Sequence, residues 1–267
     1  MALKLKKHFG MSAIPFNKDV QPLFQYKQLE QLHELLELAV ETDSGTLVTG
    51  QAGTGKTTAV RGFVDTLPSN KYRVIYLGYD QKGNTLFARL GLELGLKVSS
   101  SRAYRMLQLK QQIQRTISGA GKKLVLIVDE GHLLEGSALE DIRLLTNSDM
   151  DRSSDVVLFL LGQLWLRSKL KNHGHEALYQ RLRFRYGLEG LTLQQTKEYV
   201  SHHLGLVNGD PSIFTEPALR AIFQASGGIL REVNNLAVDC LLNACRHGSS
   251  RVDETLVRFV LDQRESA

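Results

Sequence analysis

The sequence predicts an α/β fold in which helices cover both faces of a parallel sheet, followed by a smaller bundle of helices. Three segments, Tyr72–Leu77, Leu124–Val128 and Val156–Leu161, are continuously apolar, as parallel strands buried on both faces are. Helical patterns separate these strands along the chain, and no strand pattern follows Leu191. We therefore expect an α/β core with an N-terminal arm over residues 1–190 and an α-helical lid over residues 191–267.

The elements of the core follow one another in a regular order. An amphipathic helix is expected over residues 28–40, a short strand over residues 45–50, and a second helix from Gly55 to about Leu67, ended by Pro68. Further helices are expected over residues 85–94, 102–117, 138–145 and 164–181. The helix over residues 102–117 carries an apolar stripe that should face the core, made of Met106, Leu109, Ile113 and Ile117.

Local capping signals define the helices of the lid. Thr192 and Gln195 form a capping box at the start of a helix that Gly205 ends. Thr215 precedes Glu-Pro and starts a second helix, which ends at Ser226-Gly-Gly. Two more helices are expected over residues 229–247 and 253–263.

The composition excludes several classes of protein. Of the 267 residues, 42% are hydrophobic and only 5 are prolines, so the chain can bury a core and is not a disordered scaffold. No apolar run approaches the ~20 residues that span a bilayer, and the N-terminus lacks the apolar segment of a secretory signal. The two cysteines are too few for a disulfide framework or a zinc site. We expect a cytoplasmic protein without a membrane partner.

A glycine-rich segment after the strand at residues 45–50 matches the pattern G-x-x-x-x-G-K-[ST] without deviation. Between a strand and a helix this pattern indicates a P-loop, whose backbone N–H groups wrap a phosphate at the helix N-terminus. The Lys56 ammonium would reach the β- and γ-phosphates of ATP, and the Thr57 hydroxyl would bind Mg²⁺. The candidate nucleotide-binding residues of this segment are Gly50, Gln51, Ala52, Gly53, Thr54, Gly55, Lys56, Thr57 and Thr58.

Two carboxylates, Asp129 and Glu130, directly follow the apolar strand Leu124–Val128. Ligands of open α/β sheets bind at the carboxyl ends of the strands, where this pair should lie. An acidic pair alone more often marks a turn. Downstream of a P-loop, however, Asp129 is expected to hold Mg²⁺ and Glu130 to orient and deprotonate the attacking water.

Three further residues have both a catalytic and a structural interpretation. Gln163 follows the strand at residues 156–161 and could hold the attacking water or the γ-phosphate, or be a polar residue at a helix start. Arg181 could neutralise transition-state charge on a neighbouring subunit, or belong to a basic face. Arg231 follows Gly-Gly at the start of a lid helix and is expected to point towards the nucleotide.

His132 completes an Asp-Glu-x-His sequence that is reminiscent of helicases. A two-lobed helicase motor needs a second core, and this chain carries a single P-loop. We therefore expect His132 to be a packed or surface histidine.

Basic residues are concentrated in the predicted core. Of the formal net charge of +5, residues 191–267 contribute 7 basic and 9 acidic side chains, which leaves 26 basic and 19 acidic side chains in residues 1–190. Seven basic residues and no acid lie between Lys97 and Lys123. This concentration suits a polyanionic partner or a solvated basic face. If it binds DNA, the first candidates are Lys97, Arg102 and Arg105, because a polar Ser99–Ser101 loop next to them can bring backbone N–H groups to a phosphate.

The combined motifs resemble those of the AAA+ ATPases, and within them the ExeA-type group. The segments that carry this closer resemblance are His8-Phe-Gly-Met, Pro15-Phe16, the P-loop, Leu161-Gly-Gln163, Gln180-Arg181-Leu and Ser226-Gly-Gly-Ile-Leu-Arg231. The group includes secretion-pathway ATPases and resembles the transposition helpers TniB, TnsC, IstB and MuB. The resemblance implies an ATP site made by Lys56, Thr57, Asp129 and Glu130, with Gln163 as sensor 1, Arg181 as an arginine finger acting in trans and Arg231 as sensor 2.

Two features depart from the secretion ATPases of this group. Leu164-Trp-Leu-Arg stands where they have Pro-Glu-Leu, and the sequence shows no transmembrane or wall-binding part. We therefore expect an Mg²⁺-dependent ATPase that assembles as a ring or helical filament on double-stranded DNA, with little sequence preference, and that recruits or regulates a transposase. The alternative is an ExeA-type assembly ATPase of a secretion system without DNA binding. A third possibility, a switch with little turnover, is disfavoured by Glu130.

Overall fold

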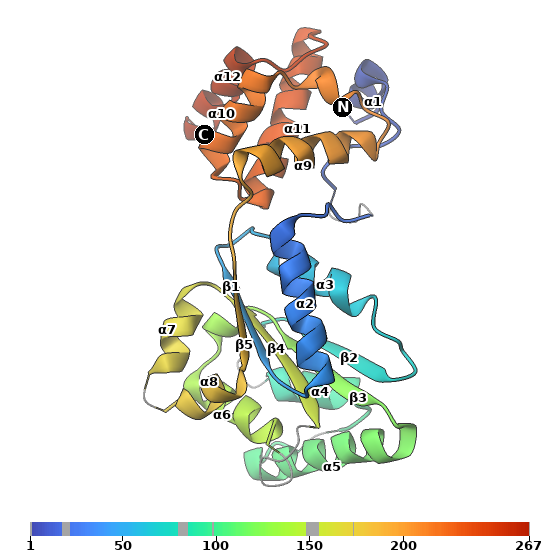
Figure 1. Ribbon diagram of the computed structural model, residues 1–267, viewed down its shortest axis with the longest axis vertical. Helices are drawn as coiled ribbons and strands as arrows, with labels where there is room; N and C mark the ends of the chain where they lie inside the picture. The colour runs from blue at the N-terminus through green and yellow to red at the C-terminus, as the bar shows by residue number, and fades with distance from the viewer. Residues whose placement is uncertain are drawn as a thin grey trace. The chain divides into compact units, whose positions relative to one another are not determined.

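The computed structural model describes residues 2–17, 22–79, 85–97, 99–147, 155–172 and 174–266. The chain divides into two compact units, whose elements are labelled in Figure 1. An α/β unit is formed by residues 27–52 and 56–188. A helical unit is formed by residues up to Tyr26, by Gly53–Gly55 and by residues from Glu189 onward.

The α/β unit is built on a five-stranded sheet in which every strand pair is parallel. Its spatial order is β2-β3-β4-β1-β5. The strands are β1 (Thr46–Gly50), β2 (Tyr72–Leu77), β3 (Lys123–Val128), β4 (Val156–Gly162) and β5 (Phe184–Leu188). Strands β1, β3 and β4 occupy the centre and are almost entirely buried, which explains their continuous apolar character.

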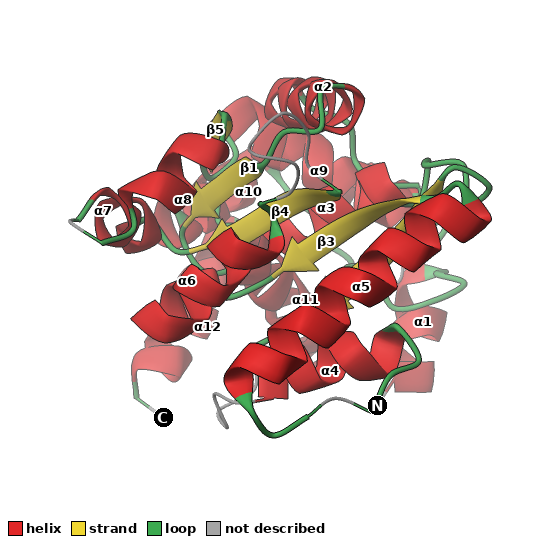
Figure 2. Ribbon diagram, turned by 90° about the horizontal axis from the view of Figure 1, so that it is seen from below, coloured by secondary structure: helices red, strands yellow, loops and turns green. Residues whose placement is uncertain are grey.

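Helices cover both faces of this sheet, as Figure 2 shows. One face packs against a set of five helices: α4 (Thr85–Glu93), α5 (Arg102–Ala120), α6 (Gly136–Leu145), α7 (Trp165–Lys171) and α8 (Glu176–Arg181). On the other face, Phe63 of α3 (Lys56–Val64) lies against Phe159 of β4, and α2 (Lys27–Glu41) packs beside α3 through His33 and Phe63. The predicted α/β fold class is therefore confirmed. In α5, Leu109 and Ile113 are buried in the core, as the apolar stripe predicts.

The helical unit contains α1 (Ala2–Phe9), α9 (Leu193–Gly205), α10 (Glu216–Ser226), α11 (Leu230–His247) and α12 (Glu254–Glu265) around one hydrophobic core. The capping box at Thr192 is present, and the Thr215 side chain caps α10 by accepting the backbone N–H of Ala218. Within the described ranges, none of the helices combines the length and apolar character needed to cross a bilayer.

Two arrangements differ from the sequence predictions. The first 26 residues, expected to accompany the α/β core, group with the helical unit, because Leu5, Met11 and Phe16 are buried in its hydrophobic core. The single helix expected over residues 164–181 is two helices, α7 and α8. The chain turns between them at Asn172, which is extended, and at Gly174, whose φ of 105° belongs to the left-handed region that favours glycine.

Candidate nucleotide-binding site

The P-loop follows β1 and continues into α3, which begins at Lys56. Gly53 and Gly55 have φ values of 87° and 90°, which side chains with a Cβ rarely adopt, so the glycines of the motif are required by the turn. The Lys56 side chain is buried, and its Nζ donates to the carbonyl oxygens of Gly50 (3.0 Å) and Gln51 (2.8 Å). An ammonium held at a helix N-terminus suits a phosphate, so these residues fit the nucleotide that the motif implies.

The Thr57 hydroxyl donates a hydrogen bond of 2.6 Å to Oδ2 of Asp129. These two residues come from different parts of the sheet, because β4 lies between β1 and β3. Asp129 is buried, and its Oδ1 accepts the backbone N–H of Glu130 (2.7 Å). The two residues predicted to bind Mg²⁺ therefore lie together.

A hydroxyl and a carboxylate suit Mg²⁺, which prefers oxygen ligands. Among the described residues, no group of three or more His, Cys, Asp or Glu side chains forms a metal site by itself. Mg²⁺ would therefore be held by Thr57 and Asp129 together with phosphate oxygens, as at other P-loops.

Tyr76 of β2 also contacts this carboxylate, although no motif or spacing predicts this contact. Its hydroxyl donates to Oδ2 of Asp129 at 3.0 Å. Burial, followed by the charge of Asp129, raises the pKa of Tyr76 to about 12, so the hydroxyl keeps its proton at neutral pH and remains a donor. Tyr76 is therefore a third group that orients the Asp129 carboxylate.

Glu130 follows Asp129 at the end of β3 and has a φ of 54°, a left-handed conformation that is strained for a residue other than glycine. About half of its side chain is exposed (49%), in contrast to the buried Asp129. Its Oε2 lies 3.3 Å from Nδ1 of His132. A carboxylate that is exposed and close to the Thr57–Asp129 pair can act on a water molecule.

His132 lies in the short 3₁₀ helix η1 (Gly131–Leu133) and is buried. Of the two options expected from the sequence, a packed or a surface histidine, the structure has the packed one. The backbone N–H of Gln163, at the end of β4, points to Nδ1 of His132 at 3.3 Å. The structure thus brings Glu130 and the Gln163 backbone to the same ring atom. The Asp-Glu-x-His spacing is the sequence signal that could have indicated this contact.

Arg181 does not lie with these residues. It is the last residue of α8, and its carbonyl oxygen accepts the backbone N–H of Gly45 (3.2 Å), just before β1. Strands β1 and β5 pair in register from Thr46 with Phe184 to Gly50 with Leu188, so Arg181 lies at their amino ends. The P-loop begins at the carboxyl end of β1, about 16 Å away for five strand residues at ~3.3 Å each.

Arg231 lies in the first turn of α11 in the helical unit, with which Gly53–Gly55 group. Within this unit, its backbone N–H donates to the carbonyl oxygen of Gly53 (3.1 Å). A Cβ at Gly53 would lie 2.8 Å from the Cβ of Arg231, so the approach itself requires glycine. This backbone contact brings Arg231 next to Gly53 of the P-loop. The contact of its side chain with the nucleotide stays a prediction.

The residues predicted to contact DNA are largely engaged within the chain. Arg102 forms an ion pair with the buried Asp141 (2.7 Å), and Arg105 donates to the carbonyl oxygen of Ser99 (3.5 Å). The backbone N–H of Ser99, proposed to meet a phosphate, donates to Oε1 of Gln108 (2.9 Å). Lys97 is exposed. A phosphate at this loop would have to replace several intramolecular interactions.

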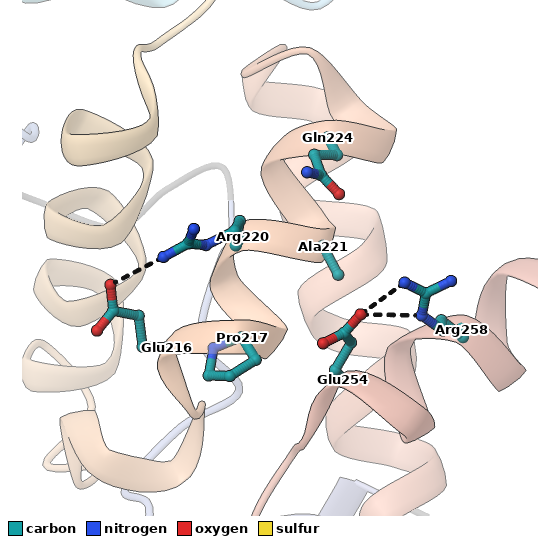
Figure 3. A pocket seen from close by; sticks show the side chains of 7 residues that line it. All are labelled: Glu216, Pro217, Arg220, Ala221, Gln224, Glu254 and Arg258. Atoms are coloured by element: carbon teal, nitrogen blue, oxygen red, sulfur yellow. Dashed lines mark hydrogen bonds and ion pairs between the residues drawn. The ribbon is translucent and has the colours of Figure 1, made fainter.

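A separate pocket of about 460 Å³ lies in the helical unit between α10 and α12 (Figure 3). Its charged side chains are paired with each other, Glu216 with Arg220 (3.5 Å) and Glu254 with Arg258 (2.6 Å). None of the lining residues belongs to the predicted nucleotide site. The pocket is therefore compensated in charge and is not the site indicated by the motifs.

Comparisons with known proteins agree with this geometry. Residues 40–170 match the family described as "AAA domain". The chain is 31% identical over 250 residues to general secretion pathway protein A of Aeromonas hydrophila, which covers 91% of this chain and 45% of that protein. The chain thus spans less than half the length of this relative.

Two solved structures show the same fold at low sequence identity. The Aeropyrum pernix ORC2 protein, solved as ADPNP–ADP complexes, superposes with a TM-score of 0.72 at 13% identity over 92% of this chain and 70% of that chain. The Drosophila ORC bound to DNA gives a TM-score of 0.67 at 18% identity over 99% of this chain and 66% of that chain. Residues 40–170 thus match an AAA domain, and the α/β fold of this chain matches that of AAA+ P-loop ATPase structures.

Proposed function

We propose that the protein is an Mg²⁺-dependent ATPase that works as an assembly factor of a secretion pathway. The observation that carries the ATPase part is the 2.6 Å contact between Thr57 and Asp129, which joins the P-loop to the end of β3. Lys56 and Glu130 complete a set with one residue for each task that ATP hydrolysis requires.

In this proposal each side chain has one role. Lys56 binds the β- and γ-phosphates, and Thr57 and Asp129 hold Mg²⁺, which when bound neutralises charge on the phosphate oxygens. Glu130 takes a proton from the attacking water. Gln163 at the end of β4 orients that water or the γ-phosphate, and Arg231 at the start of α11 is the proposed sensor 2.

The position of Arg181 supports assembly of several copies. Its place at the amino ends of β1 and β5 is distant from the P-loop of its own α/β unit. Arg181 is therefore proposed to reach the γ-phosphate on a neighbouring copy, where an arginine is worth on the order of 10³ in rate.

The secretion role rests on the 31% identity to general secretion pathway protein A over 91% of this chain. DNA binding with a transposase partner remains a second candidate, because the Lys97–Lys123 stretch is basic. Its support is weaker, since four of the seven basic residues have carbonyl or carboxylate partners within the chain, namely Arg102, Arg105, Lys110 and Lys123.

The test of the ATPase is a pair of variants at the proposed site. Lys56→Ala should abolish binding of a fluorescent ATP analogue, because the phosphates lose their ammonium partner. Glu130→Gln should keep the dissociation constant within about threefold and lower kcat by at least 10²-fold, since only the proton acceptor is lost. Hydrolysis by Glu130→Gln at the wild-type rate would show that the site is assigned incorrectly.

The choice between the secretion and the DNA role is made by fluorescence anisotropy with duplex DNA across a salt series and with a non-hydrolysable ATP analogue. The secretion role predicts no ATP-dependent DNA binding at physiological salt. Affinity that falls steeply with salt, by about 0.9 log units per log unit of salt for each phosphate contact, would favour the DNA role instead.

A further inference from the structure

His132 is a buried side chain that contacts the proposed general base. Its Nδ1 lies 3.3 Å from Oε2 of Glu130 and 3.3 Å from the backbone nitrogen of Gln163. The ring also meets Trp165 of α7 edge to face, with centroids 5.0 Å apart and an interplanar angle of 84°. One ring atom therefore faces both the end of β3 and the end of β4.

Nδ1 can serve only one of these two neighbours at a time. In the tautomer with the proton on Nε2, Nδ1 is an acceptor and takes the N–H of Gln163. In the tautomer with the proton on Nδ1, the same atom donates to the Glu130 carboxylate. Burial lowers the pKa of His132, which favours these two neutral forms over the charged one. The position of a single proton thus decides which strand end the ring contacts.

The surroundings hold the backbone of His132 in this place. Lys169 of α7 donates to the carbonyl oxygen of His132 (3.2 Å) and also to that of Leu134. The turn packs closely on β4, since a Cβ at Gly131 would lie 2.6 Å from Cδ1 of Leu160. A Cβ at Gly162 would lie 3.2 Å from the backbone nitrogen of His132. The histidine therefore cannot move away from the Glu130 carboxylate without disturbing the end of β4.

We propose that His132 is a positioning residue of the ATP-hydrolysing site, whose Nδ1 donates to the Glu130 carboxylate in one neutral tautomer and accepts the Gln163 backbone N–H at the end of β4 in the other. This inference rests on the proposed function and adds to it a link between the general base and the sensor position. Because Glu130 has an exposed side chain on a strained turn, it needs such a partner to keep one orientation.

The kinetic test uses two complementary substitutions. His132→Phe keeps a ring against Trp165 but removes Nδ1, whereas His132→Asn loses the ring but keeps a polar atom near the Nδ1 position. We expect His132→Phe to lower kcat about tenfold or more, with nucleotide affinity within about threefold of the wild type. His132→Asn should recover a large part of kcat. Wild-type kcat in His132→Phe would overturn the proposal, as would losses in both variants that follow a fall in Tm.

A second test does not depend on ATP hydrolysis. In nucleotide-free protein, side-chain ¹⁵N NMR reports the tautomer of His132, whose signals are assigned by their loss in His132→Phe. Glu130→Gln should shift the Nδ1 resonance, because the acceptor changes from a carboxylate to an amide. Glu140→Gln is the matched control, since Glu140 pairs with Arg143 in the same unit.

The two tests separate failure of the link from failure of the proposed function. An Nδ1 resonance unchanged by Glu130→Gln would overturn the link even if the protein hydrolyses ATP. A shifted resonance in a protein that neither binds nor hydrolyses ATP would support the contact and refute the ATPase proposal alone.

Discussion

Several buried polar side chains are paired differently in the two units of the molecule. In the helical unit, Thr196, Ser226 and Asn243 each donate to a carbonyl oxygen three or four residues earlier on their own helix. In the α/β unit, Asp129 and His132 contact groups from other strands or turns. Polar groups that bond within their own helix are satisfied locally, whereas groups that meet across the sheet form a site where a ligand can bind.

The largest effect that would sharpen this comparison is expected at Arg181. If Arg181 acts in ATP hydrolysis, Arg181→Ala should lower kcat about 10³-fold, while nucleotide affinity and Tm stay near their wild-type values. Steady-state ATPase assays with purified variants measure this. Arg183→Ala is the matched control, since Arg183 lies two residues further along the chain and its guanidinium stands 5.3 Å from the ring centre of Phe184.

The trans role of Arg181 is checked by mixing. Subunits with Arg181→Ala and subunits with Lys56→Ala should regain part of the activity together, because some interfaces then combine an intact arginine with an intact P-loop. Mixtures that assemble and stay inactive would contradict a trans role.

In the helical unit, we expect a buried polar side chain to affect the free energy of unfolding instead of turnover, and this effect should depend on pH. His203 is buried among Phe16, Tyr199 and His202, and burial, followed by the charge of His202, lowers the pKa of His203 to about 4. In the unfolded chain His203 has a pKa near 6.5 and binds a proton that it does not bind in the folded protein at the same pH. The free energy of unfolding therefore falls as the pH drops from about 6.5 to about 4.

The expected size of this effect is about 2 kcal/mol between pH 7 and pH 5, from the difference between the two pKa values. Chemical denaturation of the wild type and of His203→Phe at both pH values measures it. The variant should lose less stability than the wild type on acidification, and equal losses would remove His203 as the cause.

The smallest effect is expected in the basic Lys97–Lys123 stretch. This prediction tests whether its charged side chains pair within the chain or bind DNA. Arg102 balances the buried Asp141, so Arg102→Ala should lower Tm by a few degrees and leave DNA affinity unchanged. Arg115→Ala, at an exposed position of the same helix, should change neither. A fall in DNA affinity in Arg102→Ala at unchanged Tm would instead make this stretch a binding surface.

Much of the fold could be predicted because its signals are local. The capping box at Thr192 and the cap at Thr215 involve residues within one turn, and the structure confirms both. The P-loop is likewise local, since Gly53 and Gly55 are required by the backbone of a single turn. The single helix predicted over residues 164–181 was wrong, although residues 171–176 carry no apolar side chain and include Gly174, which could have indicated the break between α7 and α8.

The contacts of the site and of the basic stretch could not be predicted, because they join residues far apart in the sequence. The Lys97–Lys123 stretch contains no acid, yet Asp43 and Asp141 from other elements pair with Lys123 and Arg102. Similarly, the contact of His132 with Gln163 depends on β3 and β4 being neighbours in the sheet. A linear charge pattern therefore overstates what remains available to a partner.

The left-handed backbone at Glu130 also has a consequence for how far this fold can be stabilised. Glycine adopts a φ of 54° without strain, whereas a residue with a Cβ bears a cost of about 1 kcal/mol there. A sequence optimised for folding alone would carry glycine at this position. Because Glu130 is the proposed proton acceptor, thermostability and turnover make opposite demands on the same residue, and an engineered gain in one would come at the expense of the other.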